Sequence, residues 1–287
     1  MSLSILTNIS AMQTQQNLLQ TSNQVAQSMQ RLSSGLAINT AADNAAGYAI
    51  SESLTSQTNG LNQASSNVND AISMVQTASS SLNNIQNMLQ RVYELGVQYN
   101  NGTLSSQDQT DIQAEVNQLT QEINRQQSAS NFNGINLLNG TAGSASNGTV
   151  TFQVGANSGD TLSATFSSVE GNSGLGGLGF TWTNATSGGT VIDLSQSGAL
   201  ASLSDAINNI SSMAATLGAV QNRLQYTSDA IASTDQNLTA TNSQIKDVNM
   251  AQQMTDLTQQ QILEQAGTAM LAQAQAQPQL LLKLIGG

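Results

Sequence analysis

The densest group of side chains that could do chemistry lies between residues 108 and 115, where Asp108, Asp111 and Glu115 follow at intervals of three and four. Paired carboxylates can act as a general acid and a general base. The chain has no histidine, however, and no basic cluster lies near these residues in the sequence. We therefore interpret the three carboxylates as a solvated helix face or as charges at a helix N-terminus, where the helix dipole favours negative charge.

The residue types on which most enzyme sites depend do not occur in this sequence. Without cysteine or histidine it cannot form disulfides, zinc sites built on those ligands, or Ser-His-Asp and Cys-His nucleophile systems. The glycine cluster from Gly174 to Gly179 lacks the lysine and the following helix of a phosphate-binding loop. We expect no enzyme activity, no cofactor and no metal site.

Arginines are the charges that we expect to matter most, because the chain has only six lysines and arginines in total. Four of them lie on predicted helices: Arg31, Arg91, Arg125 and Arg223. A partly buried arginine needs a carboxylate or carbonyl partner. That partner lies either in the same chain, where the pair holds the helices in register, or in a neighbouring subunit, and the sequence leaves both alternatives open.

The charge and composition of the chain limit the kinds of molecule that it can bind. A formal net charge of −11 leaves no basic face for a nucleic-acid backbone. No long apolar run is present, so we expect no helix that crosses a membrane. The start of the chain has no basic segment followed by an apolar run, so we expect no cleavable signal peptide. Because 3% of the residues are aromatic and 8% charged, burial must come from long helix seams.

Heptad spacing organises the chain from Ile50 to Tyr99. The face repeats every seven residues, in alternating steps of four and three, which keeps it turned toward a supercoiling partner. The series is Ile50, Leu54, Gln57, Leu61, Ala64, Val68, Ala71, Val75, Ala78, Leu82, Ile85, Leu89, Val92, Gly96 and Tyr99. At about 1.5 Å per residue this helix would be on the order of 75 Å long, too long for an ordinary compact domain. We predict a helical rod.

A second heptad series lies late in the chain and predicts the partner of this rod. It comprises Leu203, Ile210, Leu217, Leu224, Ile231, Leu238 and Ile245. Ile207 and Ala214 occupy the second seam position, and polar residues replace them further on. Two long heptad segments separated by a different kind of sequence predict one antiparallel coiled-coil pair.

Both ends of the chain carry apolar stripes on predicted helices with neutral outer faces. The helices are expected from Ser2 to Leu36 and, beyond the late rod, as far as Pro278. Their stripes include Ile5, Ile9, Met12, Leu257, Ile262, Met270 and Leu271. The outer faces carry Gln, Asn, Ser and Thr in place of the charges of an ordinary solvated helix. We expect the two ends to fold together, and to do so when neighbouring copies bury them.

The segments between these helices have other patterns. Residues 37–47 are small and polar and predict a connector, and a further helix should carry Ile112 and Val116 on one side. Glycine becomes frequent from residue 141 to 197, where four stretches predict short strands: 149–154, 161–166, 179–183 and 190–194. We predict a hairpin turn at residues 157–160 and a small local cluster capped by Trp182.

Several motifs, taken together and in order, resemble those of bacterial flagellins. They are LTNISAMQTQQNL near the start, QRLSSGLAINTAADNAAGYAIS (30–51), LQRVYELGVQ (89–98), IQAEV (112–116), FNGINLLNG (132–140), FQVGAN (152–157), LGAVQNRL (217–224) and QILEQAGTAMLAQAQAQPQLLLKL (261–284). Three features depart from the family pattern. The middle is much shorter than in flagellins that carry large outer domains. Tyr93 stands where a second arginine is common, and the chain ends in two glycines where leucines and a terminal arginine are frequent.

The resemblance implies a mainly α fold, with long antiparallel coiled-coil rods formed by the N- and C-terminal parts and a small β-hairpin-rich middle. It divides the chain into an inner helical core (1–43 and 246–287), an outer rod (44–140 and 201–245) and a short surface-exposed segment (141–200). It also implies secretion and polymerisation into the extracellular flagellar filament used for swimming. The implied partners are other copies of the chain, an export chaperone and a filament cap protein.

Three residues match a recognition surface of this family: Arg91, Leu95 and Glu115. The resemblance implies that this surface contacts the neighbouring subunit and is recognised in the monomer by the vertebrate Toll-like receptor for flagellin. It assigns the terminal stripes to assembly of the inner core.

Two other classes of protein fit part of the sequence. A hook–filament junction protein of the same axial system has similar ends and forms no long filaments, but the glycine-rich middle and the motifs FQVGAN and LGAVQNRL favour the filament subunit. A membrane-active effector would insert its terminal helices into lipid. Because lysine is scarce on their polar faces, we expect no membrane insertion.

Overall fold

The computed structural model describes residues 8–143, 147–169, 183–185, 189–196 and 198–285, and the side chains near the C-terminus as far as Ala276. It has two compact units. The terminal unit comprises both ends of the chain, Met1–Gln57 and Gln236–Gly287, and the central unit comprises Thr58–Asp235.

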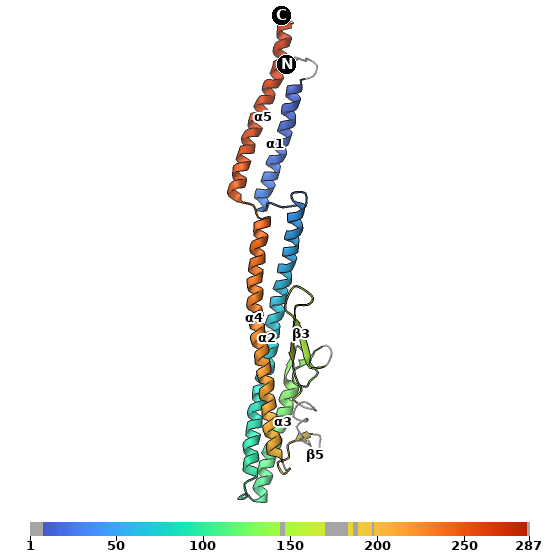
Figure 1. Cartoon of the computed structure of the whole chain (residues 1–287), viewed down its shortest axis with the longest axis vertical. Coiled ribbons are helices and arrows are strands. Elements are labelled where there is room, and N and C mark those ends of the chain that lie inside the picture. The colour runs from blue at the N-terminus through green and yellow to red at the C-terminus, as the bar shows by residue number, and fades with distance from the viewer. Residues whose placement is uncertain (1–7, 144–146, 170–182, 186–188, 197, 286–287) are drawn as a thin grey trace. The chain divides into compact units, whose positions relative to one another are not determined.

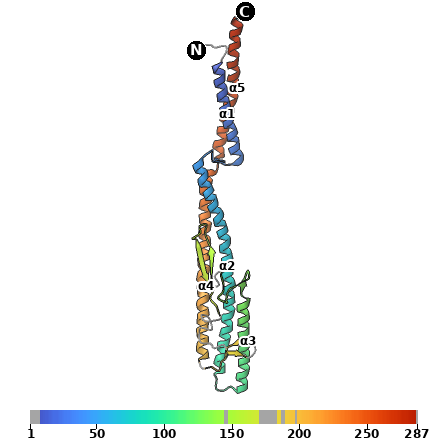
Figure 2. The same cartoon turned by 90° about the vertical axis from the view of Figure 1, so that its right-hand side faces the viewer.

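Helices dominate both units (Figures 1 and 2). They are α1 (Ile9–Ser34), α2 (Ala45–Tyr99), α3 (Ser106–Ala129), α4 (Ala199–Lys246) and α5 (Met250–Ile285). In the described residues the strands pair as three antiparallel hairpins: β1 (Asn131–Phe132) with β2 (Ile135–Asn136), β3 (Thr149–Gln153) with β4 (Thr161–Thr165), and β5 (Thr183–Ala185) with β6 (Gly189–Val191). The expectation of a mainly α fold with a small β-hairpin middle is confirmed.

In the terminal unit, α1 and α5 lie side by side and antiparallel (Figures 1 and 2). Leu18 lies against Gly267, where an added Cβ would stand 3.2 Å from the leucine Cδ1. Further along, the Ser28 hydroxyl donates to Gln260 Oε1 at 2.8 Å. Residue numbers thus rise along α1 as they fall along α5, and the predicted pairing of the two ends is confirmed.

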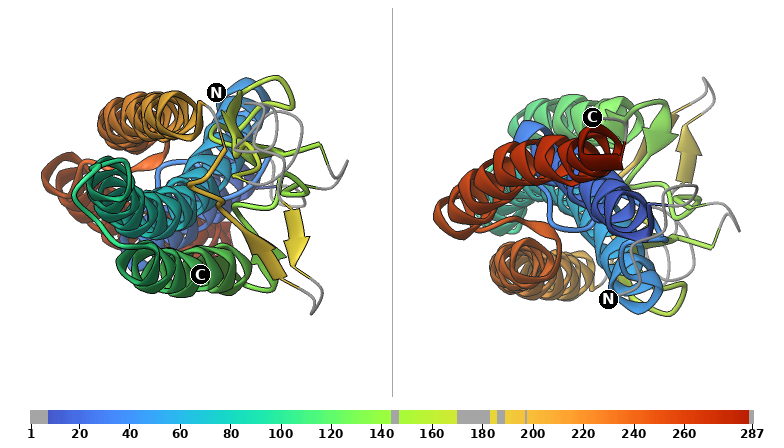
Figure 3. Two further views of the ribbon diagram at one scale, coloured as in Figure 1. Left: turned by 90° about the horizontal axis from the view of Figure 1, so that it is seen from below. Right: turned by 90° about the horizontal axis from the view of Figure 1, so that it is seen from above.

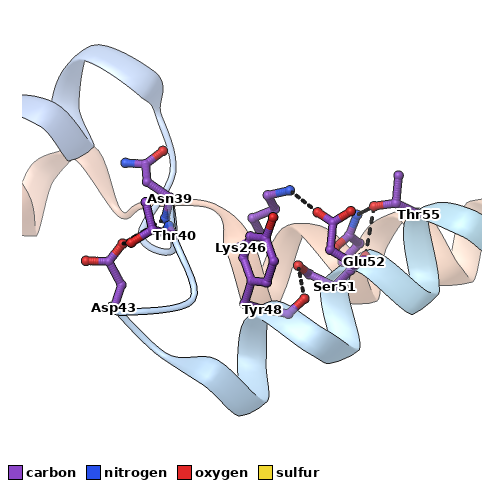
Figure 4. A network of polar contacts seen from close by, with 9 residues as sticks. Asn39, Thr40, Asp43, Tyr48, Ser51, Glu52, Thr55 and Lys246 are labelled. Atoms are coloured by element: carbon purple, nitrogen blue, oxygen red, sulfur yellow. Dashed lines mark hydrogen bonds and ion pairs between the residues drawn. The ribbon is translucent and has the colours of Figure 1, made fainter.

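The connector between α1 and α2 is held by backbone contacts and by the Asp43 carboxylate, whose contact with the Thr40 side chain is drawn in Figure 4. Gly35 ends α1 in the left-handed conformation (φ 73°), and its carbonyl accepts from the Val248 N–H at 3.0 Å. Asp43 accepts from the backbone N–H of Asn39 and from the N–H and hydroxyl of Thr40. The connector is shorter than predicted because Asn44 caps α2, accepting from the Gly47 N–H at 3.0 Å.

In the central unit, α2 runs antiparallel to both α3 and α4, and the hairpins lie to one side of these helices (Figure 3). Gln86 donates to the Ser211 hydroxyl on α4, and Gly96 leaves room for Leu200. Toward α3, the Gln109 amide donates to the Tyr99 carbonyl at 3.3 Å. The central unit therefore contains a third helix, α3, beside the antiparallel pair of α2 and α4 that the heptads predict.

The predicted seam is confirmed through most of α2. The buried members are Leu61, Ala64, Val68, Ala71, Val75, Ala78, Leu82, Ile85, Leu89 and Val92. At the other end of α2, Ile50 is exposed and Ser51 is buried in its place. The burial of a serine in place of an isoleucine agrees with the polar contacts in that part of the terminal unit, where Asn242 donates to the Thr55 hydroxyl at 3.2 Å.

The seam of α4 differs from the prediction in its second position. Leu203, Ile210, Leu217, Leu224 and Ile231 are buried as expected. The residues buried in the second seam position are Ala206 and Val220. Ile207 and Ala214, which were predicted there, are half-buried. Steps of three and of four both return to nearly the same helix face, so the pattern alone did not select between these neighbours.

The strand predictions were accurate for the hairpin of β3 and β4, whose turn closes through a bond from the Asp160 N–H to the Asn157 carbonyl at 3.0 Å. The strand predicted at 190–194 was wrong at its end, because β6 stops at Val191. Beyond it, the Gln113 amide of α3 donates to the Ile192 carbonyl and accepts from the Leu194 N–H. Trp182 and most of the strand predicted at 179–183 lie outside the described residues.

Two helix ends also differ from the predictions. Within the described residues α1 begins at Ile9 and is capped by Asn8, so the first residues of the predicted helix lie outside the description. α5 does not end at Pro278 and continues to Ile285. A proline inside a helix removes one backbone bond and need not end the helix where another group supplies the missing donor.

Candidate functional site

The terminal unit carries an unusual amount of exposed apolar surface. Large side chains of α1 and α5 with 49% to 70% of their surface exposed are Ile9, Met12, Leu19, Met29, Met250, Met254, Ile262, Leu263 and Met270. We call this set the apolar terminal surface. Leu257 and Leu271, which the sequence analysis grouped with it, are half-buried. Ile5 lies outside the described residues.

This surface is almost uncharged. Along α1 the sequence has one charged residue, Arg31, and along α5 it has Asp256, Glu264 and Lys283. A group of apolar side chains exposed to water favours association with another protein surface. Because the polar side chains around them are neutral, another surface can cover them without the cost of desolvating charges. The arrangement is therefore suited to burial against other helices.

Arg91 on α2 forms the centre of a charged cluster in the central unit. Its Nε and Nη2 atoms lie 3.1 Å and 3.0 Å from Glu115 Oε1 on α3, and its Nη1 lies 3.2 Å from Glu94 Oε2. Hydrogen bonding to Glu115 raises the pKa of Arg91 above its ordinary value. Arg91 and Glu115, predicted from the sequence to share a surface, are thus brought together. Glu94 was missed, although its spacing of three residues from Arg91 is a known signal for a helix pair.

Leu95 does not share the exposed surface of that cluster. It is 2% exposed and packs inside the central unit, one turn along α2 from Arg91. The neighbouring exposed apolar side chains are Tyr93 and Val97. Any part that Leu95 takes in recognition must therefore act through the packing of α2.

Other arginines also have partners in the same chain. Arg31 Nη2 lies 3.6 Å from Asp43 Oδ1 in the terminal unit. Arg125 pairs with Glu122 within α3 and so holds no second helix. No ion pair of Arg223 occurs among the described residues. Within the chain, Arg91 joins α2 to α3, whereas Arg31 joins α1 to the connector that precedes α2; a pair with a neighbouring subunit stays a prediction.

The carboxylates of α3 have structural partners, as the sequence analysis expected. Asp108 and Ser105 form a capping box at the start of the helix, and the Ser105 hydroxyl, which donates to Asp108 at 2.7 Å, lowers the pKa of that carboxyl. Asp111 accepts from the Gln107 amide at 3.1 Å. In the part of the chain that the structure describes, no group of three or more acidic side chains is placed to hold a metal ion.

Among the described helices, none combines the length and the apolar character that crossing a bilayer requires.

Together these features define a class: a helical protein whose two ends fold against each other and present an almost uncharged apolar surface. Comparison with known families gives the particular family. Residues 5–143 match the bacterial flagellin N-terminal helical region, and residues 200–285 match the bacterial flagellin C-terminal helical region. The chain belongs to the bacterial flagellin family.

Individual relatives match over nearly their whole length. The flagellar filament 33 kDa core protein of Treponema phagedenis is 42% identical, with 97% of this chain and 98% of the relative covered. The flagellins of Halalkalibacterium halodurans and of Bacillus subtilis are each 39% identical at the same coverage. The family resemblance drawn from the sequence motifs is confirmed.

Proposed function

We propose that this flagellin is the structural subunit that polymerises into the helical filament of the bacterial flagellum and thereby serves swimming motility. It acts outside the cell after secretion, and it performs no catalysis. The relatives named as filament core proteins support this function over that of a junction protein.

The observation that carries the proposal is the apolar terminal surface. Burying an exposed side chain of Leu, Ile or Met is worth about 1.5–3 kcal/mol when the burial is complete. Members of the set lie on both helices of the pair, from Ile9 to Met29 on α1 and from Met250 to Met270 on α5. A single chain leaves them in water, and neighbouring copies of the same pair can cover them. Order in this unit therefore depends on assembly.

Repetition of one such contact gives a polymer. Subunits that join head to tail about an axis without closing form a helix of indefinite length. In this proposal residues 1–43 and 246–287 form the inner core, residues 44–140 and 201–245 form the outer rod, and residues 141–200 face solvent.

The proposal also includes contacts of the central unit and binding of two helper proteins. Arg91 and Glu115 are half-exposed on the central unit, so their pair can meet a neighbouring subunit in the filament or the Toll-like receptor in the monomer. The uncovered terminal helices of the free chain would be held by an export chaperone, and a filament cap protein would guide their addition.

The experiment is polymerisation of purified full-length protein onto short filament seeds, viewed by electron microscopy. We expect filaments of micrometre length from the intact chain. Variants that lack Met1–Leu36, or everything after Ile245, should remain soluble and fail to elongate the seeds. Normal filaments from either truncation would contradict the assembly mechanism, and seeds that never elongate with the intact chain would favour the junction protein. Leakage from lipid vesicles on addition of the monomer would instead favour a membrane-active effector.

A further inference from the structure

One backbone carbonyl of α5 has lost the partner that a helix ordinarily provides. In an α-helix the carbonyl of each residue accepts from the N–H four positions later. Four positions after Ala274 stands Pro278, the only proline of the chain, which has no N–H. Because α5 continues to Ile285, the opening lies within the helix and not at its end.

The donor comes from the other end of the chain. Asn8 Nδ2 donates to the Ala274 carbonyl at 2.8 Å in a part-buried contact. The Oδ1 atom of the same side chain accepts from the Ala11 N–H at 3.1 Å and caps α1. One amide thus satisfies an open acceptor of α5 and an open donor of α1. Serine would serve as well as a cap, but its side chain is shorter and has no amide group to reach α5.

This contact can distinguish one register of the two helices from the others. Most of the remaining surface of the pair is rich in neutral amides and apolar side chains, which tolerate a slip of one turn along the helix; Leu18 against Gly267 and the Ser28–Gln260 bond are two further contacts that depend on the register. One turn before Ala274, the carbonyl of Met270 is already the acceptor for the Ala274 N–H within the helix. The open acceptor created by Pro278 therefore meets the Asn8 donor in one alignment.

We propose that Asn8, the Ala274 carbonyl and Pro278 form a register lock, which aligns α1 with α5 as the terminal unit is enclosed in the filament. The proposal rests on the proposed function and assigns positioning roles to Asn8 and Pro278 within it. Neither residue was singled out for this role by the sequence motifs, because the contact joins positions 266 residues apart.

The test is a double-mutant cycle in the full-length chain, with the variants Asn8→Ser, Pro278→Ala and their combination. Asn8→Ser keeps a neutral cap and removes the amide donor. Pro278→Ala returns an N–H to α5, so that the Ala274 carbonyl regains its helical partner. The readout is the critical concentration for seeded polymerisation. We expect Asn8→Ser to raise it about tenfold in the native background and to change it less than twofold when residue 278 is alanine.

A second measurement keeps the test independent of the Pro278 variant. In filaments of the native protein and of Asn8→Ser, the ¹³C shift of the Ala274 carbonyl should differ, as expected for the loss of a hydrogen bond. An unchanged shift overturns the lock, as does an Asn8→Ser penalty of equal size in both backgrounds. Native protein that forms no filaments contradicts the proposed function, whereas native filaments with an unaffected Asn8→Ser variant contradict the lock alone.

Discussion

Replacing Ile262 by glutamine separates the stability of the single chain from that of the filament. Ile262 lies on α5 with 60% of its surface exposed, so in the free chain the change removes little buried area. Full burial of an isoleucine side chain is worth about 1.5–3 kcal/mol. The exposed part leaves roughly 1–2 kcal/mol to be gained on assembly, which corresponds to about a five- to thirtyfold rise in critical concentration for Ile262→Gln.

The assay is seeded polymerisation at graded protein concentrations, together with thermal unfolding of the unpolymerised chain. Ile262→Gln should lower the unfolding temperature of the free chain only slightly, because the smaller part of the side chain is buried there and glutamine is also a good helix former. The matched control is Ile262→Leu, which conserves volume and apolar character and should polymerise as the native protein does. Polymerisation of Ile262→Gln at the native critical concentration would show that other copies do not cover this surface, and the reasoning would be refuted.

Further predictions concern the central unit and the connector. Glu115→Gln should lower the free energy of unfolding by at most about 1 kcal/mol, because its pair with Arg91 is half-exposed; a loss of several kcal/mol in chemical denaturation would contradict this. Gln113→Ala should lower the free energy of unfolding by about 1–3 kcal/mol, because two part-buried hydrogen bonds are lost, and should speed amide exchange at Leu194. Unchanged exchange there would argue against the hydrogen bond from Leu194 to Gln113. The pKa of Asp43 is lowered chiefly by the N–H of Thr40, so its stabilisation is present above the ordinary carboxyl pKa and is lost as the pH falls through the lowered one. Asp43→Asn should therefore weaken the acid dependence of unfolding followed by circular dichroism, and an identical pH profile would count against it.

Much of the helical fold could be predicted because it repeats. A seam that returns every seven residues places Val68, Val75 and Leu82 on one face whatever the partner is, and these side chains are fully buried. The heptad pattern does not predict which residues are buried where the helices meet through polar contacts. At Ile50 the periodic position is exposed and Ser51 is buried, and nearby Asn242 donates to the Thr55 hydroxyl across the helix pair.

The details that depend on distant partners could not be predicted in this way. Strand β6 ends at Val191, and beyond it the Gln113 side chain makes the hydrogen bonds to Ile192 and Leu194 that a neighbouring strand would make. The spacing of residues in either segment does not predict this contact. Pro278 was expected to end a helix by a local rule, but a side chain from the opposite end of the sequence supplies a donor. The motifs predicted the family, which the comparisons confirm, whereas the recognition surface at Arg91 stays a prediction and Leu95 of the same motif is buried.

Amide hydrogen exchange compared between the free chain and the filament tests the central claim most directly. The claim is that the terminal unit gains its stability when other copies enclose it. We expect weak protection of residues 9–34 and 250–276 in the free chain, strong protection of the same residues in the filament, and strong protection of α2 from Leu61 to Val92 in both. Firm protection of both terminal segments in dilute free chain would contradict the account.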